Sequence, residues 1–291
     1  MGAKFGPAGN SESFQAMGYR KTIQVPEYII RMGLDAYEYQ CGRGVRISGE
    51  AARAFGEKAR EHQVILSLHS PYYISLSGIE EEKRLGSIEY ILQSARAADA
   101  MGAQRVVVHS GSCAKLSRQQ AMELAKDTLT HAYQRLDQEG LGHIRLCPET
   151  MGKLNQLGTL EEVLELCLLD ERLIPCIDFG HLNARTFGAI NSFEGIRQVF
   201  ETMENVLGLD RMRQFHAHFS KIEYTEKGGE KCHLTFADTV YGPQFEPVAE
   251  MIVRKNASPT IICESAGTQA EDAATMKRMY AQALAACGQA E

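Results

Sequence analysis

The chain has 291 residues, of which 44% are hydrophobic and 23% charged, a composition typical of globular proteins. Its net charge of −6 excludes recognition of nucleic acid through overall positive charge, so such binding would need a local basic patch. No apolar run approaches the length of a membrane span, and the amino-terminal segment lacks the apolar stretch of a signal peptide. The eight cysteines show no Cys-x-x-Cys pair and several lie in apolar segments, which predicts free thiols in a reducing cytoplasm.

Strand patterns and helix patterns alternate along the chain. The predicted strands are Ala3–Phe5, Ala36–Gln40, Val64–Leu68, Arg105–Val108, Ile144–Pro148, Leu173–Asp178, Gln214–Phe219 and Thr260–Cys263. The predicted helices are Pro26–Met32, Gly49–His62, Glu82–Met101, Ser117–Glu139, Thr159–Leu169, Phe193–Leu207, Phe245–Lys255 and Ala270–Cys287, and Ser220–Gly242 reads as a long polar loop. Two of these helices open with capping boxes, Ser117 with Gln120 and Thr159 with Glu162.

This alternation predicts an α/β protein with a parallel sheet and crossover helices. Eight such units favour a closed (β/α)8 barrel, a TIM barrel, built as one domain over residues 1–291. An open doubly wound sheet is the alternative, and it would gather polar residues near one switch point. Here the polar residues follow strands three to eight, which favours a ring.

Histidines and carboxylates stand at the ends of these strands, and in a barrel those ends meet at one mouth. The residues are His69, His109, Glu149, Asp178, His181, His216 and Glu264. Imidazole together with carboxylate suits zinc, manganese or iron, and three clustered carboxylates repel one another unless a cation compensates them. Seven ligand residues exceed the needs of one ion, so we expect at least two ions, about 3.5–4 Å apart, bridged by Glu149. Such a pair lowers the pKa of a bridging water and suits displacement at phosphorus.

The motifs around these residues carry a resemblance to a known family. They are Leu68-His69-Ser70-Pro71-Tyr72, Val108-His109-Ser110-Gly111, Pro148-Glu149-Thr150, Asp178-Phe179-Gly180-His181, Phe215-His216-Ala217-His218 and Cys263-Glu264-Ser265. Over residues 5–280 the chain resembles the endonuclease IV family of apurinic/apyrimidinic endonucleases, within the xylose-isomerase-like TIM-barrel superfamily. The resemblance implies a cytoplasmic, monomeric zinc-dependent hydrolase of base-excision repair. Such an enzyme cleaves the DNA backbone 5′ to abasic sites, with a metal-bound hydroxide as nucleophile.

The resemblance also implies three ligand sets for zinc, with manganese as an alternative metal. The first set is His69, His109 and Glu149; the second is Glu149, Asp178, His216 and Glu264; the third is His181 and His233 with a carboxylate. The family supplies that carboxylate from an Asp-x-His pair, but Lys231 replaces the aspartate here, so Glu230 or Glu223 must substitute or the site is weak or empty. We expect His218 to line the mouth rather than bind metal.

The DNA contacts are expected on the loops that follow the strands. Tyr72 and Tyr73 follow His69 and could stack or wedge at the lesion. A local basic patch could be formed by Arg43, Arg46, Lys153, Lys221, Lys227 and Lys231. The alternative for each of these charges is an ordinary solvated surface residue.

Two rival functions remain open on the sequence alone. Glu149, Asp178, His216, Glu264 and His181 also resemble the single-metal site of sugar or keto-acid isomerases and epimerases, in which Glu149 and Glu264 would serve as acid and base. His69 and His109 are the residues that favour the phosphodiesterase, because they add a metal site. A barrel that only binds a ligand is the third alternative.

Overall fold

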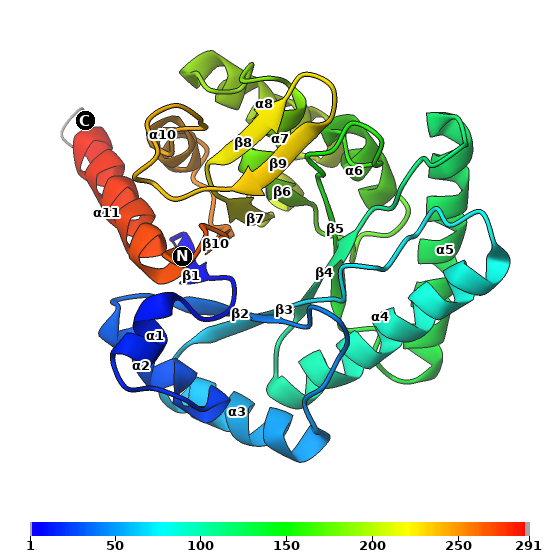
Figure 1. Cartoon of the computed structure of the whole chain (residues 1–291), viewed down its shortest axis with the longest axis horizontal. Helices are drawn as coiled ribbons and strands as arrows, with labels where there is room; N and C mark the ends of the chain where they lie inside the picture. Colours follow the sequence, from blue (N-terminus) through cyan, green and yellow to red (C-terminus); the bar gives the residue numbers. More distant parts are fainter. Residues whose placement is uncertain (1, 289–291) are drawn as a thin grey trace.

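The computed structural model describes residues 2–288 and has eight parallel strands arranged in a ring, with helices outside it (Figure 1). The barrel strands are β1 (Lys4–Pro7), β2 (Ala36–Gln40), β3 (Ile65–His69), β4 (Arg105–His109), β5 (Arg145–Glu149), β6 (Cys176–Asp178), β7 (His216–Phe219) and β10 (Thr260–Cys263). Each strand pairs with the next around the ring, β10 lies between β7 and β1, and a bridge between Ala8 and Glu38 joins the first two strands. The structure is therefore a TIM barrel, as the sequence predicts.

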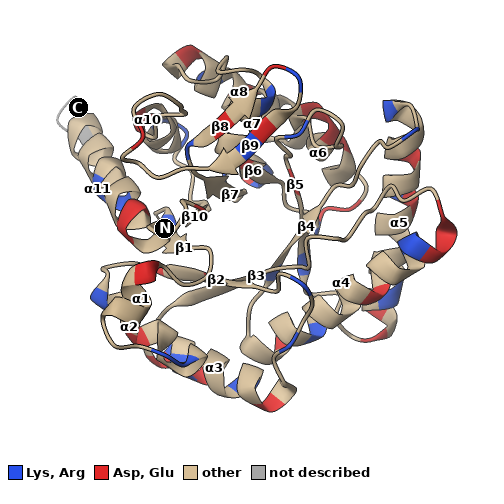
Figure 2. Cartoon of the chain, viewed as in Figure 1, with Lys and Arg blue, Asp and Glu red and all other residues tan. Residues whose placement is uncertain are grey.

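Helices cover the outside of the ring. They are α1 (Glu12–Ala16), α2 (Val25–Arg31), α3 (Gly49–Glu61), α4 (Glu81–Met101), α5 (Arg118–Gln138), α6 (Leu160–Cys167), α7 (Phe179–Arg185), α8 (Phe193–Leu207), α9 (Leu209–Met212), α10 (Glu246–Arg254) and α11 (Gln269–Gly288), with a short 3-10 turn at Thr22–Gln24. Both predicted capping boxes are present, at Ser117 and Thr159. Basic and acidic residues are interspersed on the outer helices, as expected for surfaces in water (Figure 2).

The helices pack on the barrel through their apolar faces. On α3, for example, Ala52, Phe55 and Ala59 are buried while the charged residues between them face out. This spacing of three to four residues places one side of the helix on the sheet. Within residues 2–288, no helix is both long and apolar enough to cross a membrane.

The segment 220–242 is not the plain loop that its polar sequence predicts. It contains a two-stranded antiparallel hairpin, β8 (Ile222–Thr225) and β9 (Gly229–His233), which lies over the ring beside α7 (Figure 1). Helix α7 was not predicted either; it begins directly after β6 because the side chain of Asp178 caps it by accepting from the backbone N–H of His181. These two elements bring His181 and His233 to the mouth of the barrel.

The register of the strands sets the depth of each inward side chain. His109 on β4 pairs with Glu149 on β5, and Asp178 on β6 pairs with His218 on β7. Side chains on one strand alternate between the interior and the helices, so these residues form one layer at the carboxyl-terminal mouth. The candidate site is built from this layer.

Candidate metal centre

Glu149 is the centre of the cluster at this mouth. Its Oε2 atom lies 3.4 Å from Nε2 of His69 and 3.5 Å from Nε2 of His109. Its Oε1 atom lies 3.0 Å from Nδ1 of His218 and 3.5 Å from Nδ1 of His181. One carboxylate therefore faces four imidazoles, two on each oxygen. The predicted convergence of His69 and His109 on Glu149 is present in the structure.

The spacing around Oε2 suits a shared cation. Ligand atoms about 2.0–2.1 Å from a tetrahedral zinc ion stand about 3.4 Å from each other. The two distances from Oε2 to His69 and His109 match that value. Within the described residues, Oε2 of Glu149 and Oδ2 of Asp178 are buried and accept no hydrogen bond. Because buried polar atoms normally have partners, these two oxygens fit metal ligands.

The histidine tautomers fit the same role. A carbonyl oxygen can only accept, so each ring nitrogen bonded to one must carry the proton. Nδ1 of His69 donates to Ser70 O at 2.8 Å, and Nδ1 of His109 donates to Tyr72 O at 3.1 Å. In the neutral form of each ring, Nε2 is then the nitrogen without a proton, and it faces Glu149. This arrangement, with the outer nitrogen bonded to the protein, is typical of metal-bound histidines.

The negative charge of Glu149 also favours a cation. Burial opposes ionisation of Glu149, but the neighbouring histidines, His218 foremost, outweigh it and hold its pKa well below the usual range. Burial likewise opposes a charge on His69, but Glu149 outweighs it and raises the pKa of His69 to about 9. For His109 burial prevails and lowers the pKa to about 4. Without metal, Glu149 is thus ionised and lies beside a protonated His69.

The second ligand set assembles with His218 in place of His216. Ligand atoms of Glu149, Asp178, His218 and Glu264 all lie within 4.8 Å of one another. The geometry thus groups His218, which was expected only to line the mouth, with these carboxylates, whereas His216 was the expected ligand. Both histidines point into the barrel, but His216 pairs with Cys176, one layer deeper. There its Nε2 bonds Glu38 at 2.9 Å.

The third set is His181, Glu230 and His233, whose ligand atoms also lie within 4.8 Å of one another. Nε2 of His181 is 3.5 Å from Oε2 of Glu230, and Nδ1 of His233 is bonded to Ser220 at 2.8 Å. Of the two carboxylates considered for this place, Glu230 occupies it. Glu223 instead pairs with Lys231 at 2.6 Å on the exposed side of the hairpin.

A β-bulge explains how Glu230 reaches the site. In a regular strand, residues three apart point to opposite faces. Here the hairpin register shifts between Glu223 and Tyr224, which leaves Lys231 without a pairing partner in the ladder. The extra residue returns Glu230 and His233 to the same face. The bulge therefore supplies a carboxylate, that of Glu230, where the resemblance implied an aspartate at the position of Lys231.

The residues expected to contact DNA lie on the rim. Tyr72 and Tyr73 are 51% and 41% exposed, and each is bonded to Arg43, through the guanidinium and the carbonyl oxygen respectively. Arg46 and Lys153 are exposed as well. Lys221 does not fit the expected patch, because it is buried and donates to the carbonyls of Phe236 and Asp238. Lys231 is neutralised by Glu223.

Two buried residues below the cluster were missed by sequence reasoning. Glu38 on β2 is fully buried and contacts His216 and His218. Cys176 on β6 has its sulfur within 4.8 Å of a nitrogen of each of these histidines. The sequence did indicate that Glu38 is unusual, because it is a charged residue inside a predicted strand.

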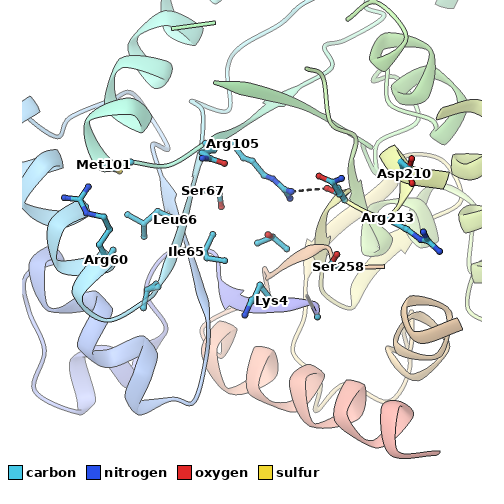
Figure 3. A pocket seen from close by; sticks show the side chains of 18 residues that line it. Lys4, Arg60, Ile65, Leu66, Ser67, Met101, Arg105, Asp210, Arg213 and Ser258 are labelled. Atoms are coloured by element: carbon cyan, nitrogen blue, oxygen red, sulfur yellow. Dashed lines mark hydrogen bonds between the residues drawn. The ribbon is translucent and has the colours of Figure 1, made fainter. Parts of the chain in front are cut away.

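A cavity of about 960 Å3 lies at the opposite, amino-terminal mouth (Figure 3). It is lined by residues that start the strands, among them Lys4, Ile65, Arg105 and Thr260. Arg105 spans this mouth and donates to the carbonyl of Gln214 at 3.0 Å. None of the clustered histidines lines this cavity, so we do not assign the chemistry to it.

Comparison with known proteins agrees with this architecture. A family model described as a xylose isomerase-like TIM barrel matches residues 26–284. An uncharacterized protein of Methanocaldococcus jannaschii is 34% identical over 235 residues, which cover 81% of this chain and 83% of that protein. A probable endonuclease 4 of Methanosphaera stadtmanae is 26% identical over 161 residues, covering 54% of this chain and 56% of the relative. The match thus spans little more than half of that endonuclease.

Solved structures show the same fold. The endonuclease IV of Thermus thermophilus superposes with a TM-score of 0.66 at 20% identity, covering 97% of this chain and 98% of the other. A D-tagatose 3-epimerase-like protein superposes with a TM-score of 0.70 at 19% identity, covering 98% of both chains. The resemblance predicted from the motifs is confirmed, and the endonuclease IV and the epimerase-like protein both share the barrel.

Proposed function

Because this chain belongs to the xylose isomerase-like TIM barrel family, we propose that it is a metal-dependent phosphodiesterase resembling endonuclease IV. Its substrate would be DNA with abasic sites, cleaved 5′ to the missing base in base-excision repair. The relatives described as probable endonuclease 4 support this assignment. The eight free cysteines are in keeping with a reducing compartment, so we place the enzyme in the cytoplasm and expect it to act as a monomer.

One observation carries the proposal. His69 and His109 both face the same oxygen of Glu149, which also belongs to the cluster with Asp178, His218 and Glu264. A single-metal isomerase needs only the second set. The added pair gives Glu149 the position of a bridge between two ions, and the set on the hairpin can hold a third.

The proposed ligands divide among three sites. They are His69, His109 and Glu149; Glu149, Asp178, His218 and Glu264; and His181, Glu230 and His233. Mixed nitrogen and oxygen donors suit zinc, with manganese as the alternative. Bound cations of this kind activate water near neutral pH and offset charge on phosphate oxygens.

The chain's own residues then position the DNA. Glu149 is buried and its Oε1 is bonded to His218, so its carboxylate would keep the first two sites at a fixed separation. Tyr72 and Tyr73 stand exposed on the rim, where an aromatic ring can stack on an unpaired base. Arg43, Arg46 and Lys153 would bind the phosphate backbone on the same rim.

The test is incision of an abasic-site duplex by metal-loaded protein. We expect a single-strand break at the lesion and none in an undamaged duplex of the same sequence. Glu149→Gln should abolish the break and release metal, since it removes the bridging charge. The assignment fails if wild-type protein loaded with zinc, manganese or cobalt makes no break.

A single-metal sugar or keto-acid isomerase is the second candidate. The fold similarity to the D-tagatose 3-epimerase-like protein and the set around Glu149 and Glu264 favour it. In that case Glu149 and Glu264 would act as acid and base on a bound sugar. Elemental analysis separates the two candidates: one ion per chain supports the isomerase, and two or three support the phosphodiesterase.

A further inference from the structure

Glu38 is a fully buried carboxylate inside the barrel, below the proposed metal ligands. Its Oε2 has two hydrogen-bond partners, and its Oε1 has one and lies beside a nitrogen of His218, which itself has no hydrogen-bond partner in the part of the chain that the structure describes. Oε2 accepts from Ser67 at 2.9 Å and lies 2.9 Å from Nε2 of His216. Oε1 accepts from Gln40 at 3.1 Å and lies 3.0 Å from Nε2 of His218. Three hydrogen bonds, from Ser67, His216 and Gln40, therefore fix the position of one negative charge.

A carboxylate at this depth is costly to bury. The interior of a TIM barrel is normally filled by branched apolar side chains, and Val107 and Ile262 play that role here. Transferring an ionised carboxylate into such surroundings is unfavourable unless it is paired and hydrogen-bonded. A leucine or valine would fill the space without that cost, so the charge needs a reason beyond packing.

His218 connects this charge to the metal cluster. Its Nε2 faces Glu38, while its Nδ1 lies 3.0 Å from Oε1 of Glu149 and 3.5 Å from Oε1 of Glu264. A neutral imidazole has one nitrogen with a proton and one without, and only the second can bind a metal. A buried carboxylate 3.0 Å from Nε2 favours the proton on that nitrogen by its charge, and Nδ1 is then the nitrogen that can bind a metal.

We infer that Glu38 is a positioning residue, which fixes the ring orientation and tautomer of His218 so that Nδ1 points at the second metal set. The inference rests on the metal-dependent function proposed above. His216 and Ser67 are bonded to Oε2 of Glu38, and these bonds keep Oε1 next to His218. Glu38 itself touches none of the reacting groups.

The test compares wild-type protein with Glu38→Gln, which keeps the shape and a hydrogen-bond acceptor but removes the charge. Metal-free protein is titrated with Co²⁺, followed by its visible absorption. Outer carboxylates of this kind typically change metal affinity about 10–100-fold, so we expect a loss of this size for one ion. Histidine 15N spectra give a second readout, in which the His218 resonances, assigned with His218→Gln, should lose the Nε2-protonated pattern.

Thr128→Val is the matched control, because Thr128 is also buried and donates to a distant backbone carbonyl, that of Leu76. It should lower stability without changing cobalt affinity or the His218 resonances. If Glu38→Gln merely lowers the melting temperature and leaves both readouts as in the wild type, Glu38 is structural and the inference is wrong. A wild-type protein that binds no cobalt would instead refute the proposed function itself.

Discussion

Nδ1 of His218 lies 3.0 Å from Oε1 of Glu149. His216, two residues earlier on β7, faces Glu38 instead. We therefore predict that His218→Ala removes one metal ion per chain, because the second set loses its nitrogen ligand. His216→Gln should keep the full metal count, since it retains a hydrogen-bond donor toward Glu38. Metal analysis after dialysis checks both variants, and the reverse pattern would restore His216 as the ligand.

The first metal set depends on His69 and His109. His109→Ala should lower the metal content by one ion and leave the second set, because Glu149 and its other neighbours stay in place. Incision of abasic DNA should fall by more than the loss of about 10–100-fold that is typical of removing a residue which only supports a ligand. Exposed His131 on α5 supplies the control, and His131→Ala should change neither quantity. An unchanged metal count in His109→Ala would show that this pair is not a ligand set.

Gly152 leaves the space that the side chain of Glu230 needs in the third set. A Cβ atom there would stand 2.6 Å from Cβ and 2.8 Å from Oε2 of Glu230, so Gly152→Ala must displace that carboxylate. We expect loss of one ion with the other two retained. Gly86→Ala is the control, because a Cβ at that position on α4 meets nothing within 4 Å. Zinc content and melting temperature should be measured together, and three ions in the Gly152 variant would exclude Glu230 as a ligand.

The barrel and its polar strand ends could be predicted because their signals are local. Short apolar runs end in a histidine or carboxylate, and each run is separated from the next by a helical pattern. The depth of a side chain is not a local property. His216 and His218 share one face of β7, and only the register against β6 decides which of them lies beside Asp178.

The hairpin and Glu38 were missed for related reasons. The polar sequence of segment 220–242 resembles a loop, and a bulge at Lys231 cannot be read from alternation. Glu38 stands between Tyr37 and Tyr39, where strict alternation would place it on a solvent-facing side. In a closed barrel that side faces the interior. The alternation of Tyr37, Glu38 and Tyr39 therefore places Glu38 inside the barrel rather than in solvent.

Tyr72, which we propose to contact DNA, is exposed on the rim. Tyr72→Ala should weaken binding to an abasic duplex about 10-fold, since stacking on one base contributes about 1–3 kcal/mol. Metal content should not change, because His109 is bonded to the backbone carbonyl of Tyr72, which the substitution keeps. Fluorescence anisotropy with a labelled duplex measures the effect. Tyr28→Phe, which alters a fully buried tyrosine, serves as a control for general loss of aromatic hydroxyls.

Glu162 links two helices away from the metal site. It accepts two hydrogen bonds at 2.6 Å from Arg118 at the start of α5, and two more from the backbone N–H groups of Gly158 and Thr159. Burial opposes its ionisation, but these donors outweigh that effect and lower its pKa. A pKa lowered in the folded state stabilises the protein above the unfolded value, about 4.3, and the stabilisation disappears as pH falls through the folded value.

Glu162→Gln should therefore lower the free energy of unfolding by about 1–3 kcal/mol at pH 7, the scale of hydrogen bonds to a charged group. The difference from the wild type should shrink as pH falls below the unfolded value of about 4.3 and through the lowered pKa of Glu162, where that side chain becomes neutral like glutamine. Urea unfolding of metal-free protein at several pH values measures it. Glu165→Gln, which removes an exposed partner of Lys126, should change stability much less. A Glu162 effect that is equal at pH 3 and pH 7 would mean that its charge contributes nothing to holding α5 and α6 together.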